Sequence, residues 1–94
     1  MIYVGIDVAK DKHDCVITNS DGEVLAKAFS FPNNLEGFNT LFQRISSICS
    51  DFSIIKVGLE ATGHYSYNLL GFLLDKKLIV LNPLHTNLFR KSLS

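Results

Sequence analysis

The 94 residues of the chain suffice for one small domain and are too few for two. Hydrophobic residues make up 47% of the sequence and charged residues 19%, a composition that is typical of a globular domain and excludes a disordered tail. Nine basic and nine acidic side chains give a net charge of zero, so any attraction to a polyanion has to be local.

The sequence also indicates the cellular location of the protein. No apolar run reaches the roughly 18 residues that a membrane span needs. Cys15 and Cys49 match no spacing typical of a metal site, and we expect both to be reduced thiols in the core. Together these features predict a protein of the cytoplasm that does not contact a membrane.

Three short strands are predicted at the start of the chain. Residues 2–7, 13–18 and 23–30 are each rich in β-branched and apolar side chains. The sequence Asn-Ser-Asp-Gly at 19–22 is a dense turn signal between the last two. Because the connections are short, we expect an antiparallel meander.

A helix is predicted next. Pro32 ends the third strand, and Asn33 is the expected N-cap, with Glu36 in the capping-box position three residues later. Apolar residues then recur at helical spacing and predict one face packed on the core. They are Leu35, Phe38, Leu41, Phe42, Ile45 and Ile48.

The remaining pattern alternates strands and helices. Residues 54–59 are apolar enough to predict a parallel strand buried on both faces. A helix is expected over about 64–75, a fifth strand over 78–81 and a last helical piece around 84–89. The predicted order is β-β-β-α-β-α-β-α, a single α/β domain.

Two acids follow predicted strands of this sheet. Asp7 ends the first strand in Gly-Ile-Asp, and Glu60 ends the fourth in Gly-Leu-Glu. Reactive groups of open α/β sheets gather at the carboxyl ends of strands, so the two carboxylates converge if these strands are neighbours. A hard divalent cation such as Mg²⁺ prefers oxygen ligands of this kind. Taken singly, either acid is equally well explained as a residue that caps a turn or a helix.

Other charged and polar residues are weaker candidates. A predicted helix start favours phosphate through its free N–H groups, and basic residues occur in the first hairpin turn and near the end of the sequence. The candidates for contacts with a nucleic-acid backbone are Thr62, Gly63, His64, Tyr65, Lys10, Lys12, Arg90 and Lys91. Their plain structural alternatives are an N-cap for Thr62 and solvated surface positions for the lysines and the arginine. Asp11 and Asp14 are expected to be turn and surface residues, and His13 has no predicted role.

Three stretches resemble one family. Met-Ile-Tyr-Val-Gly-Ile-Asp-Val-Ala-Lys-Asp-Lys-His-Asp-Cys-Val-Ile-Thr at 1–18 resembles the opening of the DEDD transposases of bacterial insertion sequences, which are related to the pilin-gene inversion recombinases. Val-Gly-Leu-Glu-Ala-Thr-Gly-His-Tyr at 57–65 resembles the second motif of that family. Asn-Pro at 82–83, with Arg-Lys-Ser at 90–92, resembles the stretch that leads to the third motif.

The resemblance implies a fold and a chemistry. The fold would be RNase H-like, of the RuvC type, and incomplete at its C-terminus. Asp7 and Glu60 would be two of four catalytic carboxylates that bind Mg²⁺ or Mn²⁺. The full-length protein would be an enzyme that cuts and rejoins DNA, guided by an RNA that the insertion sequence encodes, and it would act as a homo-oligomer.

The sequence also departs from the family pattern. Two further aspartates are expected beyond residue 94, and the only acid after Glu60 is Asp75, at the end of a predicted helix. The family carries a serine nucleophile in a separate C-terminal domain. Residues 1–94 are therefore expected to be the N-terminal part of the catalytic domain and to be inactive alone.

Two other classes of protein remain as alternatives. Actin-like sugar kinases and ATPases also open with an apolar strand, Gly-Ile-Asp and a hairpin, but they place glycines soon after the aspartate, where this chain has Val8-Ala9-Lys10. A non-catalytic domain for nucleic-acid binding or assembly would use the same fold with an incomplete set of carboxylates. Holliday-junction resolvases are close in mechanism, but Glu-Ala-Thr-Gly-His-Tyr at 60–65 disfavours them.

Overall fold

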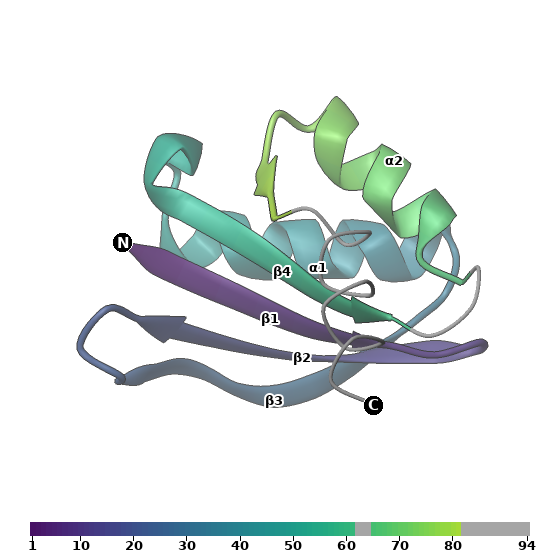
Figure 1. Cartoon of the computed structure of the whole chain (residues 1–94), viewed down its shortest axis with the longest axis horizontal. Coiled ribbons are helices and arrows are strands. Elements are labelled where there is room, and N and C mark those ends of the chain that lie inside the picture. The colour runs from purple at the N-terminus through teal and green to yellow at the C-terminus, as the bar shows by residue number, and fades with distance from the viewer. Residues whose placement is uncertain (62–64, 82–94) are drawn as a thin grey trace, which may run out of the picture.

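The computed structural model describes residues 1–61 and 65–81, which form one five-stranded sheet with two helices (Figure 1). The strands lie in the order β3-β2-β1-β4-β5. The elements are β1 (Ile2–Val8), β2 (Lys12–Asn19), β3 (Val24–Pro32), α1 (Leu35–Ile48), the short 3₁₀ turn η1 (Phe52–Ile54), β4 (Ile55–Ala61), α2 (Tyr67–Asp75) and β5 (Ile79–Val80). The predicted order is confirmed as far as β5, and the expected last helical piece lies outside the described residues.

The first three strands form the predicted antiparallel meander. At the turn between β2 and β3, the Asn19 side-chain oxygen accepts hydrogen bonds from the backbone N–H groups of Asp21 and Glu23, both at 3.0 Å. Gly22 has a φ of 82°, a conformation that glycine adopts without steric cost. The turn signal in the sequence therefore corresponds to a specific hydrogen-bonded turn.

Both helices cover the same face of the sheet. The strands β3, β1, β4 and β5 run in one direction, and the connections from β3 to β4 and from β4 to β5 move toward the same edge. Right-handed crossovers then place α1 and α2 on one side. Contact between Phe38 of α1 and Phe72 of α2, with ring centroids 5.6 Å apart, agrees with this arrangement. We call this side the covered face and the other the open face.

The N-cap of helix α1 lies one residue later than predicted. Asn34, not Asn33, is the N-cap, and its side chain accepts a hydrogen bond from the N–H of Gly37 at 2.8 Å. The predicted capping box with Glu36 is therefore wrong, because Glu36 lies only two residues after the actual cap. The apolar face packs as expected except for Leu35, which is 64% exposed.

Strand β4 alternates instead of being buried on both faces. Ile55, Val57 and Leu59 are buried against the helices, whereas Gly58 is half-buried and Glu60 exposed on the open face. Ile54 belongs to the preceding 3₁₀ turn. The prediction of burial on both faces is wrong for the described residues, because they put both helices on one side.

Among the described residues after β4, the helix and the strand are both shorter than predicted. Helix α2 starts at Tyr67, after Ser66, and its predicted start at about residue 64 falls next to residues 62–64, which lie outside the described part. Strand β5 has only two residues, although residues 78–81 were expected to form it. No helix of the described residues is long and apolar enough to cross a membrane.

Both cysteines are free, as expected. Cys15 is buried on β2, and burial raises the pKa of its thiol to about 12, against a smaller opposite effect of the Arg44 charge. Cys49 is half-buried after the end of α1. The Cys15 thiol therefore stays neutral and unreactive near pH 7.

Candidate functional site

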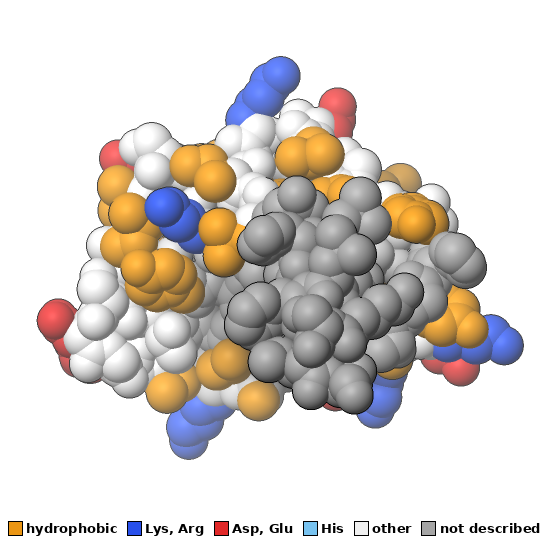
Figure 2. Space-filling view, in the orientation of Figure 1, with side chains coloured by type: hydrophobic (Ala, Val, Ile, Leu, Met, Phe, Trp, Pro, Cys, Tyr) orange, Lys and Arg blue, Asp and Glu red, His pale blue; other side chains and the backbone are white. Residues whose placement is uncertain are grey.

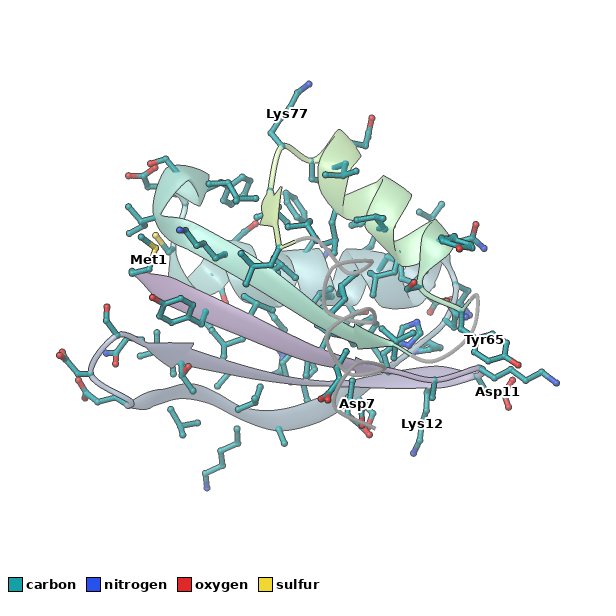
Figure 3. All side chains as sticks on the ribbon, viewed as in Figure 1. Met1, Asp7, Asp11, Lys12, Tyr65 and Lys77 are labelled. Atoms are coloured by element: carbon teal, nitrogen blue, oxygen red, sulfur yellow. The ribbon has the colours of Figure 1, made fainter. Side chains whose placement is uncertain are left out.

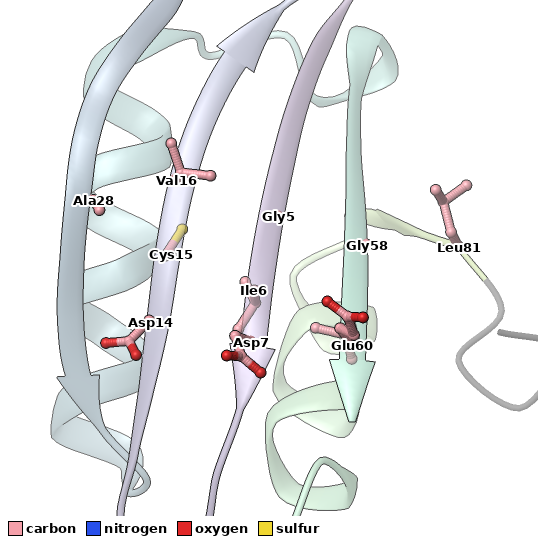
Figure 4. Close-up of a pocket in the computed structure, with 11 residues that line it drawn as sticks. Gly5, Ile6, Asp7, Asp14, Cys15, Val16, Ala28, Gly58, Glu60 and Leu81 are labelled. Carbon is pink, nitrogen blue, oxygen red and sulfur yellow. The ribbon is translucent and has the colours of Figure 1, made fainter. Parts of the chain in front are cut away.

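The predicted carboxylates lie side by side on the open face. Strands β1 and β4 are parallel neighbours, and their register pairs Asp7 with Glu60 (Figure 4). Adjacent strands of a sheet are about 4.8 Å apart. The two acids therefore converge at the carboxyl ends of the strands, as the sequence predicted.

A third carboxylate extends this line. Asp14 of β2 pairs with Asp7 across the antiparallel ladder, so Asp14, Asp7 and Glu60 cross three neighbouring strands (Figure 4). The hydroxyl of Ser30, opposite Asp14 on β3, donates a hydrogen bond to an Asp14 carboxylate oxygen at 2.5 Å. We call Asp14, Asp7 and Glu60 the acidic row.

Sequence reasoning missed the place of Asp14. The expectation that it is exposed is right, but it lies beside the strand-end acids and not apart from them. A signal was present in the alternation along β2, because His13 and Cys15 are buried and the residue between them has to face the other side. The hairpin register that sets Asp14 opposite Asp7 was not readable from composition.

The acidic row forms one end of a pocket of about 450 Å³. Gly5 and Gly58 are paired across β1 and β4 and leave the pocket floor without side chains (Figure 4). The walls are mostly apolar and include Val16, Ala28 and Leu81. The pocket therefore joins a charged end to an uncharged floor.

The charges of the row repel one another. Like charges directly opposite on neighbouring strands are destabilising, and a bound cation removes that repulsion. The donor set is made of carboxylate oxygens, which fit a hard divalent cation such as Mg²⁺. Within residues 1–61 and 65–81, no group of three His, Cys, Asp or Glu side chains is placed to hold a metal ion alone. The row fits part of a metal site and needs further ligands to complete one.

The weaker candidates fall at the same end of the molecule or outside the described part. Asp11, Lys12 and Tyr65 lie at the end of the fold that carries Asp7 (Figure 3). Lys10 and Lys12 are exposed, and Tyr65 is 43% exposed. Thr62, Gly63, His64, Arg90 and Lys91 lie outside the described residues.

The surface has no dominant charge in the view of Figure 2. Blue Lys and Arg side chains and red Asp and Glu side chains are scattered around the outline, with orange apolar side chains between them. This distribution agrees with a net charge of zero. Attraction to a polyanion therefore depends on local groups, such as those near the acidic row.

Comparison with known proteins identifies the family. Residues 4–94 match the family model of the IS110-type DEDD transposases, which confirms the resemblance seen in the sequence. The chain belongs to this transposase family.

Two curated relatives carry the name pilin gene-inverting protein. The protein from Moraxella lacunata is 33% identical over 94 residues, and the one from Moraxella bovis is 32% identical. Each alignment covers 97% of this chain and 28% of the relative, so the chain spans about 28% of the length of these proteins.

Among solved structures, a member of the Ppx/GppA protein family from Aquifex aeolicus matches with a TM-score of 0.42 and 14% identity. The match covers 88% of this chain and 35% of that structure. A similarity of this size defines neither the fold family nor a function.

Proposed function

We propose that this chain is the N-terminal part of an RNase H-like catalytic domain that cuts and rejoins DNA strands. The observation that carries the proposal is the parallel register of Asp7 and Glu60 at the carboxyl ends of β1 and β4. Membership of a transposase family supports it independently, since these enzymes rearrange DNA. Asp7 and Glu60 are the proposed metal ligands and catalytic carboxylates.

The two side chains would hold Mg²⁺ or Mn²⁺ through their carboxylate oxygens. Such ions would supply Lewis-acid chemistry at a scissile phosphodiester, favouring both the oxygen of the attacking nucleophile and the leaving oxygen of the phosphodiester. Asp7 and Glu60 supply negative charge at a fixed position, because both lie on paired strands and not on loops. The scissile phosphate would therefore meet the domain at the acidic row.

The described residues supply only part of this site. Further carboxylates and the nucleophile are proposed to come from the rest of the protein, since this chain spans about 28% of its relatives. We expect the 94 residues to bind a divalent cation weakly and not to cleave DNA alone. The intact protein would be a cytoplasmic enzyme and a homo-oligomer, guided to its DNA target by an RNA.

Contacts with the nucleic-acid backbone are proposed around the acidic row. Lys10 and Lys12 are exposed in and after the turn that follows Asp7, and Tyr65 is exposed at the same end. Lysines bind phosphate as point charges, and a tyrosine hydroxyl can donate a hydrogen bond to a phosphate oxygen. Thr62, Gly63, His64, Arg90 and Lys91 are proposed for the same role on their sequence positions.

Mn²⁺ titration of the 94-residue chain tests the metal site. Paramagnetic broadening of backbone NMR signals should centre on Asp7 and Glu60, and Asp7→Asn or Glu60→Gln should weaken the affinity at least tenfold, roughly the effect of losing a ligand or its orienting partner. Asp75→Asn is the matched control, because Asp75 ends α2 away from the row. Equal Mn²⁺ affinity in the wild type and both row variants would overturn the proposal.

A further inference from the structure

The turn between β1 and β2 begins after Val8, the residue next to Asp7, and is held from two sides. The Asn33 side-chain N–H donates a hydrogen bond to the Lys10 carbonyl at 2.9 Å, and the Asn33 backbone N–H donates to the Asp11 carbonyl at 2.9 Å. On the other side, the backbone N–H of Ala9 donates to Nδ1 of His13 at 3.1 Å. Two side chains therefore fix the conformation of this turn.

His13 makes its contact from inside the core. Its exposed fraction is 0%, and its ring lies edge-on to Phe31, with centroids 5.3 Å apart, and parallel to Phe38, with centroids 6.3 Å apart. A phenyl ring would fill such an aromatic environment without introducing any polar atom. Packing alone therefore does not explain why residue 13 is a histidine.

The hydrogen bond to Ala9 defines the state of the ring. A neutral imidazole has one nitrogen that donates and one that accepts. Because Nδ1 accepts, the proton lies on Nε2, and Nε2 has no hydrogen-bond partner within the described part of the chain. What the imidazole provides, and a phenyl ring does not, is the acceptor for Ala9.

We propose that His13 is a positioning residue for the Asp7–Glu60 pair, an inference that rests on the proposed metal site. By holding the Ala9 N–H, His13 fixes the turn immediately after Val8, the last residue of β1. Strand β1 then stays in register with β4 as far as the pair of Val8 with Ala61. This matters because a shift of one residue would turn Asp7 from the open face to the covered face.

Variants of His13 separate positioning from packing. His13→Phe keeps an aromatic ring and removes the acceptor, so we expect a folded chain whose Mn²⁺ affinity falls about tenfold, the low end of the effect of outer-shell partners. His13→Asn places an amide oxygen near the position of Nδ1 and should restore much of that affinity despite its smaller volume. A merely structural role would give the opposite order, with His13→Asn the more damaging change.

Measurements on the unsubstituted chain test the same inference without a variant. Ring ¹⁵N shifts should show the neutral form with its proton on Nε2, and the Ala9 amide should exchange with solvent more slowly than the other turn amides. A proton on Nδ1, or an Ala9 amide that exchanges as fast as its neighbours, would overturn the role of His13.

The two proposals fail in different ways. If Asp7→Asn and Glu60→Gln leave Mn²⁺ affinity unchanged, the metal site is wrong, and nuclear Overhauser contacts between residues 7 and 60 in His13→Phe then decide the positioning role. Loss of those contacts would support it, and full retention would overturn it. If the row variants lose affinity but His13→Phe does not, only the role of His13 is wrong.

Discussion

The covered face and the open face of the sheet carry different kinds of side chain, although both are made by the same strands. On the covered face, Val4 and Ile6 of β1 and Val57 of β4 are buried under the helices at 2% exposure or less. On the open face of those strands, the same stretches carry two glycines and two acids. The period of two along a strand lets one segment supply the core and the candidate site independently.

The difference between the faces lies in what each contributes to free energy. Apolar burial on the covered face is favourable at roughly 25 cal/mol per Å². The acidic row on the open face is unfavourable by itself, because Asp7 is flanked by Asp14 on one side and Glu60 on the other. Stability therefore comes mainly from one face, and the other is free to carry a chemically useful but costly arrangement.

The largest effect is expected at the centre of the covered face. Leu41 of α1 has an exposed fraction of 0%, so Leu41→Ala should lower the free energy of unfolding by about 2–5 kcal/mol through lost burial and a cavity. Leu35→Ala, on the same helix but 64% exposed, is the matched control and should change it by about 0.5 kcal/mol or less. Denaturant unfolding measures both, and equal losses would mean that burial under α1 on the covered face does not dominate the stability.

Effects of intermediate size on the free energy of unfolding are expected at two glycines. A Cβ on Gly37 would lie 2.0 Å from the Pro32 carbonyl oxygen, so Gly37→Ala should destabilise the chain by about 1–3 kcal/mol. A Cβ on Gly5, in the pocket floor, would meet Val16 at an ordinary 3.8 Å. Gly5→Ala should therefore stabilise it by about 0.4–1 kcal/mol. Thermal unfolding of both variants checks the signs, and a destabilising Gly5→Ala would mean that the pocket floor has no room for a side chain.

The smallest effect is expected in the acidic row. Asp7→Asn removes the central charge, so in the absence of divalent cations it should raise the free energy of unfolding by about 0.2–1 kcal/mol. The gain should shrink as salt screens the row. Urea unfolding at low and high ionic strength gives the comparison, with Asp75→Asn as the reference for an acid outside the row. A loss of stability at low salt would show that Asp7 has favourable partners that outweigh the repulsion.

Much of the fold was predictable because strong local patterns agreed with general rules of topology. The order of elements followed from periodicity, and the neighbouring positions of Asp7 and Glu60 followed from placing acids at the ends of parallel strands. The N-cap was not predictable, since Asn33 and Asn34 are equally good caps by residue type. Contacts of Asn33 with the β1–β2 turn decide between them, and these exist only in the folded chain.

Asp14 and His13 show a second limit of sequence reasoning. The place of Asp14 beside Asp7 depends on hairpin register, which the exact length of the turn determines. The contact of His13 with Ala9 joins a side chain to a backbone group four residues earlier, and no pattern of residues predicts it. Contacts between a polar side chain and a backbone atom are therefore the hardest part of a site to predict from the sequence.

The pairing of β1 with β4 also has a consequence for how the chain folds. The hairpins β1–β2 and β2–β3 join neighbouring segments, whereas Asp7 and Glu60 are separated by more than half of the 94 residues. Contacts between distant segments carry a larger loop-closure cost and form more slowly than local ones. The two carboxylates are thus expected to meet only late in folding, so that a partly folded chain would hold the meander but have no cation site.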